Sequence, residues 1–468
     1  MRFGVVILLL SLLATSCRKE VPKERLSSYY GKSYSEVFES FWNGMNTNYV
    51  FWDIESVNWD NMYKTYKPRF EYLDQNPNDP NNGQKAAQYL VDMTKDLSDS
   101  HLAIMFNGYA NFLVANYEIQ STNFSPAGIR HQLRGDMPPI PRSTFDYVIP
   151  KYYLTTPRVG TDGNSFRMNM GTIQRNNKKI VYLEYSSFQL LTQYLQNNTT
   201  TAPVKPVLDE FFRLTKDPSI DGLILDLRGN PGGQVVDLDF LIGRLITSPG
   251  YFSNTRTKNG SGRLDYTPWV KGYVHPQPGA TNFTKPITVL IDQYSVSMAE
   301  MTSLAVKHIF PKSKLIGEKT WGGTGQIPQN DTRYLGGQFT AANFVHVYMA
   351  GVEFRDKNLV SYENKGITPD IQIAYDPEAA KKSFVHENKP RLEKLRDAFA
   401  KAEPFNAANI EAALKAVAGE LGVKVGMLVH PVRLATTGAA SGPSLYHLLE
   451  VIGKEKSLAR IERALGSF

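Results

Sequence analysis

The chain has 468 residues, of which 42% are hydrophobic and 21% are charged, a balance that excludes an intrinsically disordered protein. This length exceeds what one compact core can hold, so two or three domains are expected. The 52 basic and 45 acidic residues leave a net charge of +7, but they are interspersed along the chain. The charge by itself therefore does not predict an anionic partner.

The amino-terminal segment predicts export. The only cysteine, Cys17, follows Arg2, an apolar stretch over residues 5–13 and three small residues. The apolar run is too short to span a bilayer and has the layout of a signal peptide. The arrangement resembles a bacterial lipoprotein signal, which implies cleavage before Cys17 and a lipid on that residue. Residues 1–17 would then be the signal and 18–32 a tether, with the protein anchored on the periplasmic or cell-surface side. Simple secretion is the alternative.

Residues 33–100 predict a small helical domain, because apolar side chains recur at helical spacing in SYSEVFESFW and again in GQKAAQYLVDMTKDL. Residues 102–177 have no clear period, and no element is assigned there. From Lys179 the chain alternates apolar strand-like runs with amphipathic helical runs up to residue 318. This alternation predicts a parallel sheet covered by helices, with functional groups in loops at the carboxyl ends of the strands.

The composition changes near Ala374. Of the 25 tyrosines only Tyr375 and Tyr446 lie beyond it, and the remaining text is almost continuously amphipathic and helical. A helical domain over residues 375–468 is therefore expected after a domain over 101–374.

Two loops after buried strands could carry chemistry. The first, DLRGNPGG (226–233), has glycines that let backbone amides turn toward a ligand, although an ordinary turn would look similar. The second, YSVSMAE (294–300), opens a helix at Ser297. Ser297 with Glu300 fits a capping box, but a hydroxyl at a helix start also lies near free amides that stabilise a nucleophile and an oxyanion. Both interpretations remain open at this point.

Taken together, the two loops resemble those of the carboxyl-terminal-processing and tricorn-core serine protease family, and ENKGITPDI (363–371) matches as well. The resemblance covers about residues 33–374. It implies an α/β fold with a crotonase/ClpP-like parallel-sheet core, and Ser297 as the nucleophile. It further implies an oxyanion hole formed by the amide of Met298 and that of Gly232 or Gly233. No metal or organic cofactor is implied.

The family divides over the catalytic base. The processing branch uses a lysine in a motif after the next strand, but the matching stretch EKTWGGTGQ (318–326) has glycine there, near Gly323, and Lys319 has the wrong offset. A serine hydroxyl needs a base within hydrogen-bond reach, so another group must serve.

The tricorn branch implies such a group. Its Ser-His pair matches Ser100 and His101 in LSDSHLAI, and imidazole can take and return a proton near neutrality. The acidic partner of that branch matches Glu363, which would act with Ser100 to orient the site. Asp99 is a competing acid, and Ser295 is a competing hydroxyl.

The last part of the chain resembles a different family. Residues 404–465, and the run 431–442 in particular, are similar to the anticodon-binding helical domain of bacterial glutamyl-tRNA synthetases. The HIGH and KMSKS signatures of the synthetase catalytic domain are missing, which excludes aminoacylation. The basic residues of this tail are scattered, so a solvated helical surface is favoured over a polyanion site. A true fusion and a chimeric gene are both compatible with the pattern, and a chimera is favoured.

The expected function is a serine-type endopeptidase acting on protein or peptide substrates. A non-catalytic ligand-binding or peptide-binding module on the same fold is the alternative. For the tail the alternative is a fragment that binds the tRNA anticodon, whereas no nucleic-acid partner is expected for the protease part.

Overall fold

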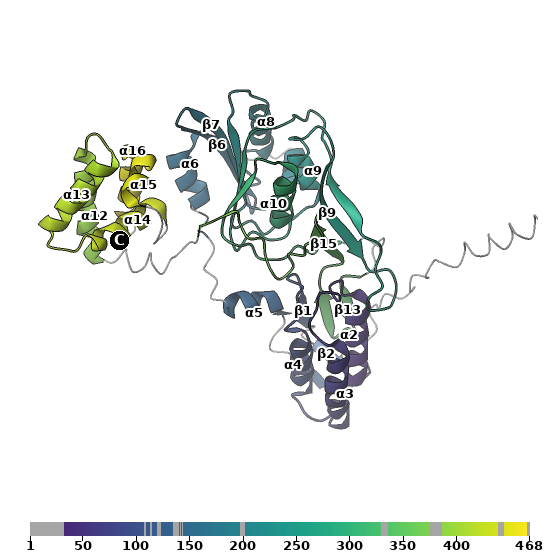
Figure 1. Ribbon diagram of the computed structural model, residues 1–468. Coiled ribbons are helices and arrows are strands. Elements are labelled where there is room, and N and C mark those ends of the chain that lie inside the picture. Colours follow the sequence, from purple (N-terminus) through teal and green to yellow (C-terminus); the bar gives the residue numbers. More distant parts are fainter. Residues whose placement is uncertain are drawn as a thin grey trace, which may run out of the picture. The chain divides into compact units, whose positions relative to one another are not determined.

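The computed structural model describes residues 32–106, 109–112, 115–118, 123–133, 140, 142, 144–196, 202–328, 336–373, 386–438 and 444–465 (Figure 1). The chain divides into two compact units, Met1–Ile371 and Gln372–Phe468. Cys17 and the rest of the predicted signal lie outside the described residues. None of the helices in the described part is both long enough and apolar enough to cross a membrane.

A seven-stranded sheet forms the centre of the first unit. Its order is β16 (Ile371–Gln372), β12 (Lys314–Gly317), β11 (Ile287–Ile291), β8 (Gly222–Asp226), β7 (Lys178–Tyr185), β6 (Arg167–Arg175) and β5 (Thr155–Thr161). Strands β7, β8, β11 and β12 pair in parallel, as the strand-helix alternation predicts. Strands β5 and β6 extend the sheet in antiparallel fashion from the stretch to which the sequence assigned no element.

Helices cover this sheet. They are α7 (Leu190–Leu195), α8 (Val204–Leu214), α9 (Val236–Ile242) and α10 (Met298–Ile309). The first nine residues of α10 are all buried, which explains why its sequence is apolar around most of its circumference. Helix α9 ends at Ile242, although the apolar residues of DLDFLIGRLIT (237–247) predict a helix through the whole run. The carbonyls of Gly243, Arg244 and Leu245 accept hydrogen bonds from amides of residues 277–283 instead of continuing the helix.

A second sheet was not foreseen. It is antiparallel, with the order β10 (Val270–Val274), β9 (Gly250–Thr257) and β15 (Val352–Asp356). Strand β9 reads GYFSNTRT, in which the polar residues hide any alternation. Its pairing with β15, about a hundred residues away, is what defines it as a strand.

The amino-terminal helices do not form a closed domain of their own. Helices α2 (Tyr34–Asn48), α3 (Trp59–Gln75) and α4 (Asn82–Thr94) share one apolar core with β1 (Ala103–Phe106), β13 (Phe339–Ala341) and β14 (Val345–Tyr348). In Figure 1 the purple α2 and the green β13 lie side by side, and the ring centroids of Phe41 and Phe339 are 6.3 Å apart. The predicted boundary at residue 100 therefore cuts through this core, because three amphipathic helices need a further apolar surface to cover.

Smaller elements complete the first unit. Strand β4 (Asn123–Phe124) pairs with β1, and β2 (Tyr109–Phe112) pairs with β3 (Ala115–Glu118). The described part of the first unit also contains α5 (Pro126–Leu133), the short turn η1 (Thr144–Val148) and α6 (Ile149–Tyr153).

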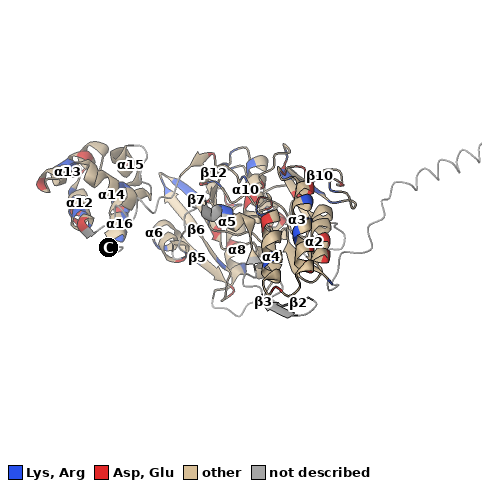
Figure 2. Ribbon diagram, turned by 90° about the horizontal axis from the view of Figure 1, so that it is seen from below, with Lys and Arg blue, Asp and Glu red and all other residues tan. Residues whose placement is uncertain are grey.

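From residue 386 onward the described part of the second unit is built from helices. It contains η2 (His386–Asn388), α12 (Lys389–Lys401), α13 (Ala407–Glu420), α14 (Gly426–Thr437), α15 (Leu445–Ile452) and α16 (Lys454–Leu465). These helices enclose a separate apolar core that includes Leu392, Leu414 and Leu449. Figure 2 shows residues of both charge signs on these helices, and α16, with the sequence KEKSLARIERAL, is an example.

Candidate active site

Ser297 lies at a strained turn between a buried strand and a buried helix. Its φ of 55° and ψ of −115° are rare for a residue with a side chain. Met298 begins α10, so its N–H has no partner within the helix, and no hydrogen bond between described residues uses it. The turn therefore presents a hydroxyl-bearing residue beside an unused backbone amide.

The glycine loop after β8 packs directly on this turn. The carbonyl of Asn230 accepts a hydrogen bond from the Val296 N–H at 3.0 Å and so ties the two loops together. Gly232 has φ = 94°, and a Cβ built on it would lie 2.7 Å from Ser297 Cβ and 2.8 Å from Met298 N. No side chain fits there, which is the physical reason for glycine at this position.

The two glycines of the loop differ in what their amides do. The Gly232 N–H donates to Asn230 Oδ1 at 2.8 Å. The Gly233 N–H makes no hydrogen bond among the described residues, while the flanking bonds from the Phe188 N–H to the Gly232 carbonyl and from the Gln234 N–H to the Phe188 carbonyl hold the loop. Of the pair that the sequence left open, Gly233 is the one with an available amide.

Glu300 is fully buried and accepts four hydrogen bonds. The donors are the Ser297 N–H at 3.1 Å, the Thr320 hydroxyl at 2.5 Å, the Gly322 N–H at 2.8 Å and the Gly323 N–H at 2.7 Å. Burial raises the pKa of Glu300 to about 7. Sequence reasoning treated this residue only as a helix cap, since the spacing from Ser297 contains no information about residues 320–323.

Glu363 is the second buried carboxylate of the site. It accepts the backbone N–H groups of Ser100 at 2.7 Å, Thr324 at 2.8 Å and Gly325 at 2.8 Å, and the Thr324 hydroxyl at 3.2 Å. Burial, followed by repulsion from Asp99, raises the pKa of Glu363 well above its ordinary value. The structure thus brings Glu363 and Ser100 together, through the Ser100 backbone.

His101 lies beside Gly323, the position near which the processing branch would have lysine. A Cβ built on Gly323 would lie 3.4 Å from His101 Cε1, 3.5 Å from Ser100 Cβ and 3.2 Å from Val296 Cγ1. The imidazole and the residue preceding Ser297 therefore flank the same glycine. Among the described residues no hydrogen bond joins the His101 ring to the Ser297 hydroxyl, and His101 Nδ1 is buried without a partner. Burial lowers the pKa of His101 to about 4, so its resting imidazole is neutral.

The competing acid and hydroxyl have structural contacts. Asp99 is buried and accepts the N–H groups of His101 and Ala350, both at 2.8 Å. The Ser295 hydroxyl is also buried, donates to the Leu227 carbonyl at 2.8 Å and accepts the Asp292 N–H at 3.0 Å. The Ser295 hydroxyl therefore holds the turn that carries Ser297 and points into the protein interior.

Ligand-type atoms of Asp99, His101 and Glu363 lie within 4.8 Å of one another. Each of the four carboxylate oxygens in this cluster already accepts a backbone N–H. The cluster therefore holds backbone segments together, and its oxygens are poorly placed to bind a cation as well.

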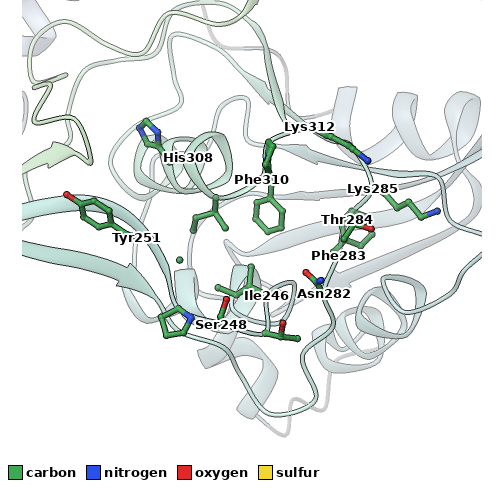
Figure 3. A pocket seen from close by; sticks show the side chains of 15 residues that line it. Ile246, Ser248, Tyr251, Asn282, Phe283, Thr284, Lys285, His308, Phe310 and Lys312 are labelled. Carbon is green, nitrogen blue, oxygen red and sulfur yellow. The ribbon is translucent and has the colours of Figure 1, made fainter.

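A cavity of about 510 Å³ lies at the opposite end of α10. Figure 3 shows Ile246, Phe283 and Phe310 in its wall, with Lys285 and Lys312 together on one side. Helix α10 has 12 residues and therefore separates this cavity from Ser297 by about 18 Å. The cavity is not the cleft in which Ser297 would meet a substrate.

Different parts of the chain match the models of different protein families. Residues 179–373 match the model of peptidase family S41, and residues 30–76 match that of the tricorn protease C1 domain. Residues 366–465 match the model of an anticodon binding domain.

Solved structures share the fold of the first unit. A Parabacteroides merdae protein described as a candidate peptidase is 22% identical, with a TM-score of 0.52 over 75% of this chain and 93% of its own. Mature CPAF complexed with lactacystin is 12% identical, with a TM-score of 0.51 over 75% of this chain and 95% of its own. At these identities the similarity shows a common architecture.

The tail is similar to a small part of other enzymes. It is 48% identical over 92 residues to the glutamate–tRNA ligase of Chloroherpeton thalassium and 44% identical over 88 residues to that of Pelodictyon phaeoclathratiforme. The chain spans only 18% of the length of each ligase. The molecule therefore joins a protease-like segment to an anticodon-binding-like segment.

Proposed function

We propose that the chain is a serine peptidase that cleaves peptide bonds through an acyl-enzyme on Ser297, since its residues 179–373 match the model of peptidase family S41. The observation that supports this most directly is the contact between Gly232 and Ser297. It puts the unused amides of Met298 and Gly233 beside the one hydroxyl that begins the buried helix α10. The proposed substrates are proteins or peptides, and the activity is assigned to the protease-like segment alone.

In the proposed reaction, Ser297 Oγ attacks the carbonyl carbon of the scissile bond while its proton passes to the neutral imidazole of His101. The carbonyl oxygen becomes an oxyanion that accepts hydrogen bonds from the Met298 and Gly233 amides, at the positive end of α10. Collapse expels the amine, which takes the proton from His101. Water then hydrolyses the acyl ester with His101 again as the base. The described residues include no hydrogen bond between the Ser297 hydroxyl and the His101 ring. In this proposal the bond forms when substrate binds, because catalytic hydrogen bonds often tighten only in the substrate complex.

Glu363 and Ser100 complete the proposed site as orienting groups. Glu363 accepts the Ser100 N–H, and Asp99 accepts the His101 N–H, so two carboxylates hold the backbone that leads into the proposed base. These bonds fix the backbone that carries the imidazole, so less conformational entropy is lost when the ring reaches the geometry for proton transfer.

A serine-directed fluorophosphonate tests the proposal. We expect one adduct per chain on Ser297, identified by peptide mass spectrometry, because only an activated serine beside an oxyanion hole reacts readily. The Ser295→Ala variant serves as the matched control and should still label at Ser297, since the Ser295 hydroxyl bonds the protein interior. A non-catalytic binding module would give no adduct, and that result, or labelling elsewhere, would refute the assignment.

We further propose that the protein is exported and carries a lipid on Cys17, on the basis of the apolar run and small residues that precede it. Expressed in a bacterium with a lipoprotein pathway, the wild type should be found in the membrane fraction with a diacylglyceryl group on an amino-terminal Cys17. The Cys17→Ser variant should lack the lipid. A soluble wild type cleaved at another site would support simple secretion instead.

A further inference from the structure

We propose that Glu300 is a positioning residue for catalysis, which sets the spacing between the nucleophile turn and the histidine loop. The proposal rests on the function proposed for Ser297 and His101 and names a residue that this mechanism did not use. Its basis is the set of four donors that converge on one buried carboxylate.

A helix cap explains only one of these four contacts. The bond from the Ser297 N–H to Glu300 Oε2, 3.1 Å long, is the reciprocal half of a capping box. The other three donors belong to residues 320–323, which are remote in sequence and unconnected with helix capping. Glu300 therefore joins the turn that carries Ser297 to a second segment.

That second segment leads directly to the catalytic base. Glu300 Oε2 accepts the Gly323 N–H at 2.7 Å, and a Cβ on Gly323 would touch His101 Cε1 at 3.4 Å. The next two amides, those of Thr324 and Gly325, donate to Glu363, which also holds Ser100. Four consecutive amides are thus shared between two carboxylates, one on the helix of Ser297 and one bonded to the neighbour of His101.

Thr320 connects Glu300 to a third segment of the chain. Its hydroxyl donates to Glu300 Oε1 at 2.5 Å and accepts the Ile367 N–H at 2.7 Å. The segment after Glu363 is therefore tied to Glu300 as well. Since Glu300 and Thr320 are both buried, water does not readily replace these bonds, and a lost partner leaves a donor unsatisfied.

The variant Glu300→Gln tests the positioning role. Glu300→Gln keeps the shape but replaces one acceptor oxygen with an NH₂ group that faces N–H donors. We expect kcat to fall about 10²-fold with KM changed by less than about 3-fold, because a small displacement of reacting groups costs rate more than binding. Casein hydrolysis and the rate of fluorophosphonate labelling both measure this.

Asp356→Asn is the matched control, because Asp356, the last residue of β15, is a buried carboxylate that contacts the carboxyl-terminal end of α10. It contacts His308 Nε2 at 3.1 Å and accepts the N–H groups of Asn358 and Val360 at 2.8 and 2.9 Å. We expect this variant to lower the melting temperature to a similar degree and to leave kcat near the wild-type value. Thr320→Val and Thr320→Ser form a second pair that leaves Glu300 in place, and kcat should fall only in the valine variant.

A selective fall of kcat in Glu300→Gln, absent from Asp356→Asn, supports the positioning role. An unchanged kcat, or equal losses in both variants, overturns it. If Glu300→Gln does not fold, the threonine pair decides: equal kcat values in the two overturn the role. A wild type that neither cleaves casein nor labels would instead refute the proposed function, so the two failures are distinguishable.

Discussion

Replacing Ser297 with alanine is expected to lower kcat/KM for casein by at least about 10⁴-fold, because no other group can form the acyl-enzyme. Binding of substrate should change little, since the Met298 and Gly233 amides remain in place. Loss of the serine at the helix start costs stability by about 1 kcal/mol, so the variant should remain folded at room temperature. Initial rates of cleavage, together with a thermal melt, measure both effects.

Ser295→Ala is the control for this result, because it removes a hydroxyl two residues away in the same turn. The Ser295 hydroxyl bonds the Leu227 carbonyl and the Asp292 N–H, so its loss should cost about 1–3 kcal/mol of stability and spare the chemistry. Equal inactivation of both variants would mean that damage to the turn explains the loss. Undiminished activity in Ser297→Ala would exclude Ser297 as the nucleophile.

Replacing His101 with glutamine has the second largest expected effect, a loss of about 10³-fold in kcat, because an amide cannot take up the proton of the serine. Glutamine resembles histidine in volume, so the contact with Gly323 should survive. Activity at the wild-type level in His101→Gln would show that another group is the base.

The pH dependence of kcat/KM provides a further check on His101. The pKa of His101, about 4, is below the ordinary value for histidine, so we expect kcat/KM to fall on the acid side near pH 4. Above that pH the imidazole is neutral and able to accept a proton. Glu300, with a pKa of about 7, adds a separate limb nearer neutrality, since its protonation places a hydrogen among four donors. A single limb near 6.5, as an exposed imidazole gives, would contradict this.

The lowered pKa of His101 also affects the free energy of unfolding. Acidification from about 6.5 toward 4 favours the unfolded chain, because its histidine protonates first.

The local spacing of apolar residues was sufficient to predict the central strands and helices. Strands β7, β8 and β11 are apolar runs, and α8 and α10 have helical spacing, so each can be recognised within its own segment. The two loops after β8 and β11 follow from the same pattern, because parallel strands bring their carboxyl ends to one edge. The absence of lysine near Gly323 is likewise visible in the sequence and directs attention to His101.

By itself the sequence determined the strand-helix alternation, the candidate nucleophile and the break near Ala374. Only the tertiary structure showed that the Gly232 amide is already bonded to Asn230 whereas the Gly233 amide makes no hydrogen bond among the described residues. It also completed the amino-terminal core with β13 and β14, and showed that Glu300 and Glu363 share the amides of residues 322–325. These features depend on the direction of individual N–H groups and on contacts between segments as much as 263 residues apart. A short-range period in hydrophobicity reports which face of a segment is buried, but not which distant backbone groups meet there.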